Sequence, residues 1–357
     1  MKDRIRIIMS AFCDENNYNA QNLNAREITY RLDPSKFDVT IFYLNNPDRR
    51  LLSQKNVRLV KMPSINEKPI HFITFLSILR HFFDKGDILF FPRGLGGCLY
   101  LAFKRLLDDE KIAIFSDECV VPAPSWVQLS ASARFIHRFN LHKCDYVYSN
   151  SKYVAENVKE YYGLETPVIY TGVDTKIFTP LPRKDKLKIL YVGSFQQRKR
   201  PFLVLEAAKR FPKVEFELIG SGPLQGMLLN MKKKFKLNNV QIRGHLPLEE
   251  LVSSMQEADI FLFPSIHEGF PKVTIEAAAT GLPVIVFDNY RPETVIDDKT
   301  GFIVKDVEEM MEKLETLIED PSLRHEMGIK AREHAKKFDW DIVVKQWEKA
   351  FEMAKEK

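Results

Sequence analysis

Two glutamates, Glu268 and Glu276, stand eight residues apart on either side of a predicted helix start. The sequence there reads as a buried strand, a loop that contains Gly269, and a helix from about Lys272 to Thr280. The first amides of a helix have no partner within it, and the positive end of its dipole lies there. This segment therefore predicts a binding site for a diphosphate or a similar anion.

The two carboxylates would have different tasks at such a site. Glu276 lies one turn inside the helix and could bind hydroxyl groups beside the anion, whereas Glu268 precedes the helix, where a transferred group would lie. The amides free to bind the anion would be those of Lys272, Val273 and Thr274. Taken alone, the same pair would equally fit a solvated loop residue and an ordinary helix charge.

Short apolar runs alternate with longer helical patterns along the whole chain, which is typical of parallel sheets built from βαβ units. The first series predicts a helix near Ala25–Leu32 and strands at Ile5–Met9, Val39–Leu44, Val57–Lys61, Ile88–Phe91, Ile112–Phe115, Tyr146–Ser149 and Val168–Tyr170. The second series predicts strands at Leu187–Val192, Val214–Ile219, Val240–Ile242, Ile260–Phe263 and Val284–Phe287, then one long amphipathic stretch from Val307 to Lys357.

A break between the two series lies at Phe178–Lys186, where Pro180 and Pro182 stand beside a run of charges. The sequence therefore predicts an α/β protein with two Rossmann-like domains of similar size. Their parallel sheets would face each other across a central cleft, because open sheets of this kind bind ligands at the carboxyl ends of their strands.

Composition excludes several classes of protein. With 357 residues, of which 45% are hydrophobic and 28% charged, the chain can bury sizeable cores and is not disordered. The net charge of +5 is too small for the dense basic stripe that nucleic-acid binding requires, although it is compatible with weak attraction to an acidic membrane. We expect no nucleic-acid partner.

Four cysteines, Cys13, Cys98, Cys119 and Cys144, form no C-x-x-C pair, which argues against a zinc site and favours reduced thiols. The longest uncharged apolar run, Pro69–Leu79, is too short to span a bilayer, and no secretory segment is evident at the start. These features predict a cytoplasmic protein.

The segment from Asp259 to Asp288 resembles the E-x7-E region of retaining GT-B glycosyltransferases of family 4. Further segments resemble motifs of that family in the same order, and together they cover about residues 146–305. They are Tyr148–Asn157, Val168–Pro180 with Thr171 in place of a family asparagine, Tyr191–Lys199, and the G-x-G-P turn at Ile219–Pro223.

The resemblance implies a donor site for a nucleoside diphosphate sugar. Glu276 would hold the ribose, Glu268 would contact the sugar near the reacting carbon, and Lys199 would bind the diphosphate. The backbone of Gly269, Phe270, Lys272 and Val273 would hold the sugar and the diphosphate. The family arginine that follows Gly193 is replaced by Ser194, so the second positive charge would come from Arg198 or Arg200.

The family pattern also implies the domain boundaries and their tasks. Residues 1–178 would form the acceptor domain and residues 179–338 the donor domain, and a final helix over residues 339–357 would pack back on the first domain. A D-x-D triplet, Asp339-Trp340-Asp341, opens that last helix. There an aspartate caps free amides, so we expect no metal and no cofactor.

The first half departs more from the family. Its glycine-rich loop is replaced by a polar loop in which Asn17 and Asn19 could bind acceptor hydroxyls or simply form turns. Where many relatives carry a histidine, Asp117 could contact the sugar or the acceptor, or be a surface carboxylate. Arg93 and Gly96 could present an acceptor site, or merely a turn after a strand.

Two stretches, Ile70–Phe83 and Arg134–Lys143, mix aliphatic, aromatic and basic residues. They resemble interfacial helices and could place the first domain on the inner face of a membrane, but a surface helix packed on a sheet has the same pattern.

The prediction is a retaining, metal-independent hexosyltransferase that uses a UDP- or GDP-linked sugar and a glycan or lipid-linked acceptor. A nucleotide-sugar epimerase or hydrolase on the same fold, or a non-catalytic nucleotide-sugar-binding or scaffold protein, remain the alternatives. A requirement for an acceptor distinguishes a transferase from an epimerase or hydrolase. Undetectable turnover with intact donor residues would indicate a binding or scaffold protein.

Overall fold

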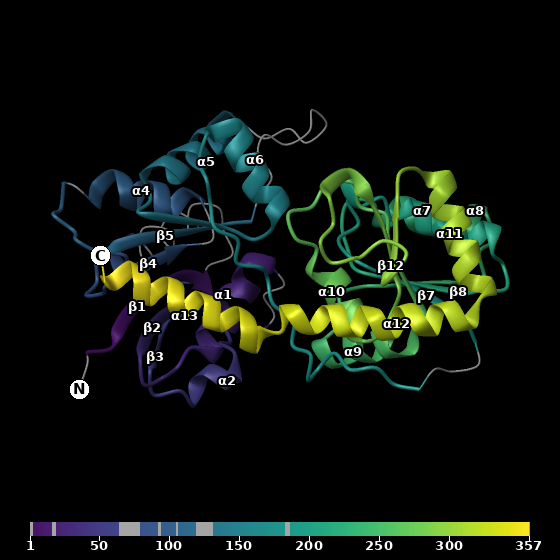
Figure 1. The fold of residues 1–357 in the computed structure, drawn as a ribbon, viewed down its shortest axis with the longest axis horizontal. Helices are drawn as coiled ribbons and strands as arrows, with labels where there is room; N and C mark the ends of the chain where they lie inside the picture. The colour runs from purple at the N-terminus through teal and green to yellow at the C-terminus, as the bar shows by residue number, and fades with distance from the viewer. Residues whose placement is uncertain are drawn as a thin grey trace. The chain divides into compact units, whose positions relative to one another are not determined.

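A computed structural model describes residues 3–15, 19–63, 79–91, 94–104, 106–118, 131–182 and 186–356. The chain divides into two compact units (Figure 1). Unit 1 comprises Met1–Thr171 and Trp340–Lys357, and unit 2 comprises Gly172–Asp339. Each unit is an α/β structure with one parallel sheet, so the predicted fold class is confirmed.

The sheet of unit 1 has six parallel strands in the order β3-β2-β1-β4-β5-β6. The strands are β1 Ile5–Phe12, β2 Phe37–Tyr43, β3 Val57–Lys61, β4 Ile88–Phe91, β5 Ile112–Asp117 and β6 Tyr146–Ser149. Its helices are α1 Ala20–Arg31, α2 Arg49–Leu52, α4 Gly94–Lys104, α5 Ala131–Lys143, α6 Lys152–Tyr162 and α13 Trp340–Glu356.

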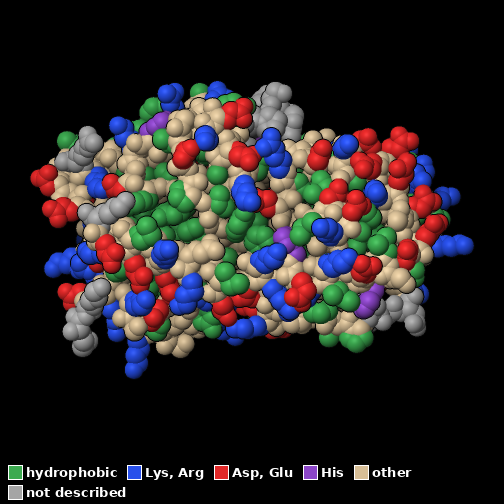
Figure 2. Space-filling view, in the orientation of Figure 1, with side chains coloured by type: hydrophobic (Ala, Val, Ile, Leu, Met, Phe, Trp, Pro, Cys, Tyr) green, Lys and Arg blue, Asp and Glu red, His purple; other side chains and the backbone are tan. Residues whose placement is uncertain are grey.

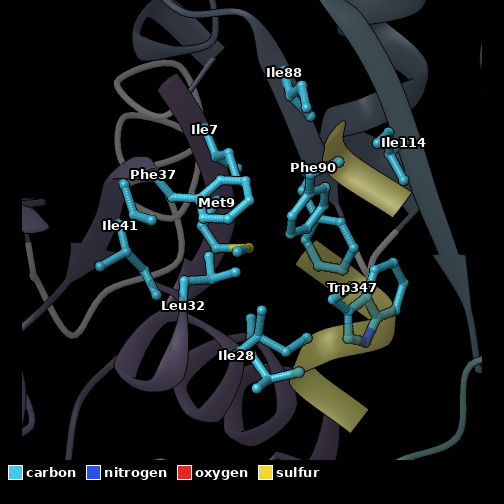
Figure 3. Packing of buried hydrophobic residues seen from close by; sticks show 14 of the residues in the cluster. Ile7, Met9, Ile28, Leu32, Phe37, Ile41, Ile88, Phe90, Ile114 and Trp347 are labelled. Carbon is cyan, nitrogen blue, oxygen red and sulfur yellow. The ribbon is translucent and has the colours of Figure 1, made fainter. Parts of the chain in front are cut away.

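Helices cover both faces of this sheet, which is why β4 is a continuous apolar run buried along its whole length. One face packs against α4, α5 and α6. The other packs against α1 and α13, the last helix of the chain. Trp347 of α13 meets Phe90 of β4 edge to face, with ring centroids 5.0 Å apart (Figure 3). Burying such a side chain stabilises a fold by roughly 1.5–3 kcal/mol.

The sheet of unit 2 also has six parallel strands, in the order β12-β11-β10-β7-β8-β9. The strands are β7 Lys188–Val192, β8 Glu215–Ile219, β9 Val240–Arg243, β10 Ile260–Phe263, β11 Val284–Phe287 and β12 Gly301–Val304. Its helices are α7 Phe202–Arg210, α8 Gln225–Lys234, α9 Leu248–Glu257, α10 Lys272–Ala279, α11 Val307–Glu319 and α12 Pro321–Ala335, with 3-10 turns η1 Gln197–Lys199, η2 Asp288–Tyr290 and η3 Lys336–Phe338.

Both sheets have the same topology. If β7 to β12 are numbered as strands one to six, the second order, read from its other end, is 3-2-1-4-5-6, as in the first sheet. In such doubly wound sheets the strand order reverses beside the first strand, and ligands bind at the carboxyl ends of the two strands that meet there. In unit 2 these strands are β7 and β10, which pair directly.

Two predicted elements differ in the structure. Val168–Tyr170 is not a strand, because only one isolated bridge joins Val168 to Ser149. The predicted stretch from Val307 onward is three helices, because Asp320 caps α12 by accepting from the Leu323 amide at 2.9 Å and Pro321 occupies the first helical position. The turn η3 then separates α12 from α13.

The boundary between the units falls before Gly172 and not after Phe178. Residues that follow Thr171 are tied to the end of unit 2: the Val173 amide donates to the Phe338 carbonyl at 2.9 Å, and the Thr175 amide donates to Asp339 Oδ2 at 3.2 Å. The charged segment near Pro182 therefore lies inside unit 2.

The two stretches with an interfacial pattern are only partly described. Phe82 is fully buried, whereas residues 70–78 lie outside the described part. Helix α5 buries Asn140 and Leu141 while Phe135 is 64% exposed beside exposed Arg134. Across the described residues no helix is both long and apolar enough to cross a membrane. Figure 2 shows acidic and basic side chains interspersed on the face drawn.

Candidate active site

The carboxyl ends of β7 and β10 hold the charged residues that the sequence singles out. Lys199 ends the short turn η1 that follows β7, and Glu268 lies in the loop between β10 and α10. Backbone contacts join these two loops, since the Ile266 amide donates to the Arg198 carbonyl at 3.0 Å. The strand topology therefore places both residues at the position where sheets of this kind bind ligands.

Glu268 is the centre of a compact polar cluster. Its Oε1 atom lies 2.5 Å from Lys199 Nζ and 3.0 Å from Arg198 Nη1, and it accepts a hydrogen bond from Ser265 Oγ at 2.5 Å. Arg198 Nη1 also donates to the His267 carbonyl at 2.8 Å. The side chains of Lys199 and Glu268 are only 12% and 10% exposed. We call Arg198, Lys199 and Glu268 the charge cluster.

Two cations share one carboxylate in this cluster. Burial opposes ionisation of Glu268, but Lys199 and Arg198 outweigh it and hold the pKa of Glu268 below its ordinary value. Burial lowers the pKa of Lys199, and Arg198 adds to that effect against the attraction of Glu268. Burial likewise lowers the pKa of His267, so this ring favours its neutral form. The cluster thus has surplus positive charge, which suits an anionic ligand.

Helix α10 supplies the second predicted anion-binding feature. No side chain caps its first turn among the described residues, which leaves the amides of Lys272 and Val273 at the positive end of the helix. The prediction that the Thr274 amide is free to bind an anion is wrong, because this amide donates to the Pro271 carbonyl at 3.0 Å. Glu276 is buried one turn further on, with Oε1 3.5 Å from Lys272 Nζ.

The loop after β7 is packed closely by the glycine-rich turn after β8. A side chain at Gly220 would lie 2.0 Å from the Gly193 carbonyl oxygen, and one at Gly222 would lie 2.6 Å from that of Phe195. Both glycines also have positive φ angles, of 146° and 154°. These glycines therefore fix the course of the chain at Gly193 and Ser194, which leads into the charge cluster.

Of the two arginines that could supply the second charge, Arg198 lies in the charge cluster. Arg200 is engaged elsewhere: its Nε donates to the Pro264 carbonyl at 2.9 Å and its guanidinium stacks 4.1 Å from the centre of the Phe287 ring.

Tyr290 was not predicted. Its hydroxyl is buried without a hydrogen-bond partner among the described residues, and burial together with Glu268 raises its pKa. No sequence signal marks it.

The alternative that Asp117 is a surface carboxylate is wrong, whereas its contact with a ligand stays a prediction. Asp117 is fully buried at the end of β5, and His137 Nε2 lies 3.1 Å from each of its carboxylate oxygens. His137 comes from α5, twenty residues later in the chain, and its Nδ1 lies 3.4 Å from the Tyr162 hydroxyl. A histidine is therefore present at this strand end, although the local sequence contains none.

The remaining predicted acceptor residues have mixed outcomes. Asn19 caps α1, because its Oδ1 accepts from the amides of Gln21 and Asn22 at 3.2 and 3.4 Å. Gly96 lies in the first turn of α4 and not in a loop. Asn17 and Arg93 lie outside the described residues. No contact described for Asn19 or Gly96 tests acceptor binding.

The D-x-D triplet divides between two elements. Asp339 ends η3 and binds the hydroxyl and amide of Thr175, whereas Asp341 lies in the first turn of α13. Within the described ranges, no three or more His, Cys, Asp or Glu side chains are grouped as metal ligands would be.

A family model matches most of the second unit, and known proteins are similar to larger parts of the chain. Residues 173–334 match the family of glycosyl transferases group 1. An uncharacterized glycosyltransferase of Methanocaldococcus jannaschii is 29% identical over 62% of this chain and 64% of its own length. A D-inositol 3-phosphate glycosyltransferase of Corynebacterium diphtheriae is 30% identical over 52% of this chain and 49% of its own length. The matches thus span less than two thirds of either relative.

Solved structures share the fold of the whole chain. Sucrose-phosphate synthase from Thermosynechococcus elongatus superimposes with a TM-score of 0.84 at 20% identity and covers 98% of this chain and 99% of its own. Anabaena HepE in complex with UDP-glucose has a TM-score of 0.79 at 15% identity and covers 98% of this chain and all of its own, 100%. Residues 173–334, most of unit 2, therefore match the glycosyl transferases group 1 family, and the whole chain shares the GT-B fold of these structures.

Proposed function

We propose that this protein is a retaining glycosyltransferase that moves a hexosyl unit from a nucleoside diphosphate sugar to a hydroxyl of a glycan or lipid-linked acceptor. One observation carries the proposal: the side chains of Lys199, 12% exposed, and Arg198, 31% exposed, share one carboxylate at the β7 and β10 strand ends, where α10 begins without a side-chain cap among the described residues. The family match of unit 2 supports it, and so does the related fold of HepE, which was solved with UDP-glucose.

The proposed reaction exchanges one bond for another at the anomeric carbon. The bond from that carbon to the diphosphate oxygen breaks, and its electron pair stays on the diphosphate. A bond forms from the acceptor hydroxyl oxygen on the same face, and the hydroxyl proton passes to the departing diphosphate. No covalent intermediate with the protein is needed, so catalysis depends on positioning and on stabilising the negative charge that develops.

The charge cluster would supply that stabilisation. Lys199 and Arg198 share the carboxylate of Glu268, which orients both cations for a diphosphate. The amides of Lys272 and Val273 would bind the same phosphates from the other loop. Glu276, buried one turn into α10, would accept hydrogen bonds from the ribose hydroxyls.

Transfer is tested by incubating the protein with UDP- or GDP-linked hexoses and candidate acceptors, and by detecting both the free nucleotide and the glycosylated product. The proposal expects nucleotide release that depends on an acceptor. Release without any acceptor would indicate a hydrolase, and conversion of one nucleotide sugar into its epimer would indicate an epimerase. Nucleotide binding without turnover on any acceptor would indicate a binding protein.

Replacing Glu276 by alanine should weaken binding of UDP or GDP, whichever the wild-type protein binds more tightly. Losing a charged hydrogen-bond partner costs about 1.5–3 kcal/mol, which corresponds to roughly a 10- to 150-fold higher Kd. Isothermal titration calorimetry measures this directly. Unchanged affinity would rule out the ribose assignment, and Glu249→Ala, on the exposed side of α9, is a suitable control.

Activity should persist in EDTA, because the chain offers its own cations to the leaving diphosphate. Initial rates measured with and without EDTA should agree within error. A complete loss of activity that Mg²⁺ or Mn²⁺ restores would show that a metal ion neutralises the diphosphate instead.

A further inference from the structure

A small pocket in unit 1 has no part in the proposed donor site. It opens at the carboxyl ends of β5 and β6, and α1 and α13 close its sides. Six residues matter for its chemistry: Asn24, Ser116, Glu118, Asn150, Thr171 and Trp340. The pocket has room for a group about the size of one water molecule. Glu118, in the wall of the pocket, is only partly buried.

Among the described residues, two residues of its wall have a buried amide oxygen without a hydrogen-bond partner, Asn24 Oδ1 and Asn150 Oδ1. Asn24 is 6% exposed and Asn150 is 5% exposed. The orientation of the Asn24 amide is set by its neighbours, because its Nδ2 donates to Glu118 Oε1 at 3.0 Å and to Thr171 Oγ1 at 3.2 Å. Buried acceptors left without a donor are costly, so the pocket is built for a group that donates.

The two residues with unpartnered carbonyl oxygens line the same small volume. A hydroxyl group has a single O–H and could satisfy one of them, whereas a protonated primary amine has three N–H donors and the size of a water molecule. A carboxylate, Glu118, also lies in the wall and favours a positive charge. A water molecule would match the two oxygens but would gain nothing from that charge.

We propose that this pocket binds the protonated primary amino group of a ligand. If the amine belongs to the acceptor, this inference rests on the proposed function. The acceptor would then be an amino sugar or an amino alcohol. The tryptophan in the wall, Trp340, and the asparagine amides supply spectroscopic signals at the pocket itself.

The test uses the full chain with ¹⁵N-labelled asparagine and two matched pairs of probes, ethanolamine with ethylene glycol, and D-glucosamine with D-glucose. Side-chain amide signals of Asn24 and Asn150 are assigned by their loss in Asn24→Ser and Asn150→Leu. We expect saturable millimolar shifts with the two amines at constant ionic strength, and affinities at least about tenfold weaker with the two neutral probes.

Asn150→Leu should abolish amine binding by filling the pocket, and Asn24→Ser should weaken it without filling the space. Asn46→Ala, at an exposed position of unit 1, should leave amine binding unchanged. Equal shifts from amines and neutral probes would overturn the inference in favour of a hydroxyl site. Absence of a saturable shift from either amine would overturn it in favour of a buried water.

The failure of this inference is distinguishable from that of the proposed function. UDP titration reports on unit 2, so amine binding without UDP binding would refute the donor site and leave the amine pocket standing. UDP binding without amine binding would refute the amine pocket and leave the donor site standing. Near-ultraviolet circular dichroism of each variant shows that it has folded, so a lost shift reports on the pocket.

Discussion

Replacing Lys199 by alanine should lower kcat by about 10²-fold or more, which is the usual effect of losing one preorganised group that stabilises developing charge. Donor binding should weaken much less, because less negative charge resides on the leaving oxygen in the ground state than in the transition state. Steady-state kinetics with a donor and an identified acceptor, together with donor titration, separate the two effects.

Two companions sharpen this measurement. Arg198→Ala should show a smaller effect of the same kind, because Arg198 also donates to a backbone carbonyl and stands farther from Glu268 than Lys199 does. Lys209→Ala is the control, since Lys209 lies on α7 and its ammonium group is 4.9 Å from the centre of the ring of Phe235, which follows α8. Full turnover in Lys199→Ala would end the assignment of the diphosphate to this cluster.

Replacing Glu268 by glutamine should have the second large effect, and a different signature. The change removes the carboxylate that Lys199 and the partly exposed Arg198 share, and breaking a buried ion pair such as Lys199–Glu268 costs about 3–5 kcal/mol of stability. The ligand-free variant should therefore unfold at a lower temperature than the wild type. UDP should restore part of the loss, because its phosphates replace the missing negative charge and binding stabilises the folded state.

The same substitution should separate binding from turnover. Glu268→Gln should bind UDP at least as tightly as the wild type, because no carboxylate competes for the cations, while kcat falls as the contact to the donor sugar is lost. Thermal melting with and without UDP, calorimetry and initial rates measure these three quantities. Wild-type stability together with wild-type turnover would contradict both roles of Glu268, and Glu206→Gln on the exposed side of α7 is the matched control.

Much of the fold follows from local pattern. Ile88–Phe91, Ile260–Phe263 and Val284–Phe287 were predicted with the bounds that the structure shows, because central strands of a parallel sheet are buried on both faces and read as unbroken apolar runs. The three C-terminal helices could also have been predicted. Asp320-Pro321 is an N-cap followed by proline at the first helical position, a boundary signal inside the predicted amphipathic stretch.

The candidate site was less accessible to sequence reasoning. The family resemblance implied that Lys199 and Glu268 belong to one donor site but did not reveal that they touch, since this contact depends on the pairing of β7 with β10. The burial of Asp117 depends on His137, which α5 returns to the strand end. The Thr274 amide donates to the Pro271 carbonyl in a local turn. The general rule that the first amides of a helix are free does not predict this hydrogen bond.

The central claim is that the charge cluster and the start of α10 form a nucleoside diphosphate site. Hydrogen–deuterium exchange of the full chain with and without UDP tests it most directly, because it locates binding without an acceptor. The account predicts slower exchange of amides in residues 193–200 and 268–276, and the same experiment on Glu276→Ala should show much weaker protection. Protection confined to unit 1, or no protection in either segment at saturating UDP and GDP, would contradict it.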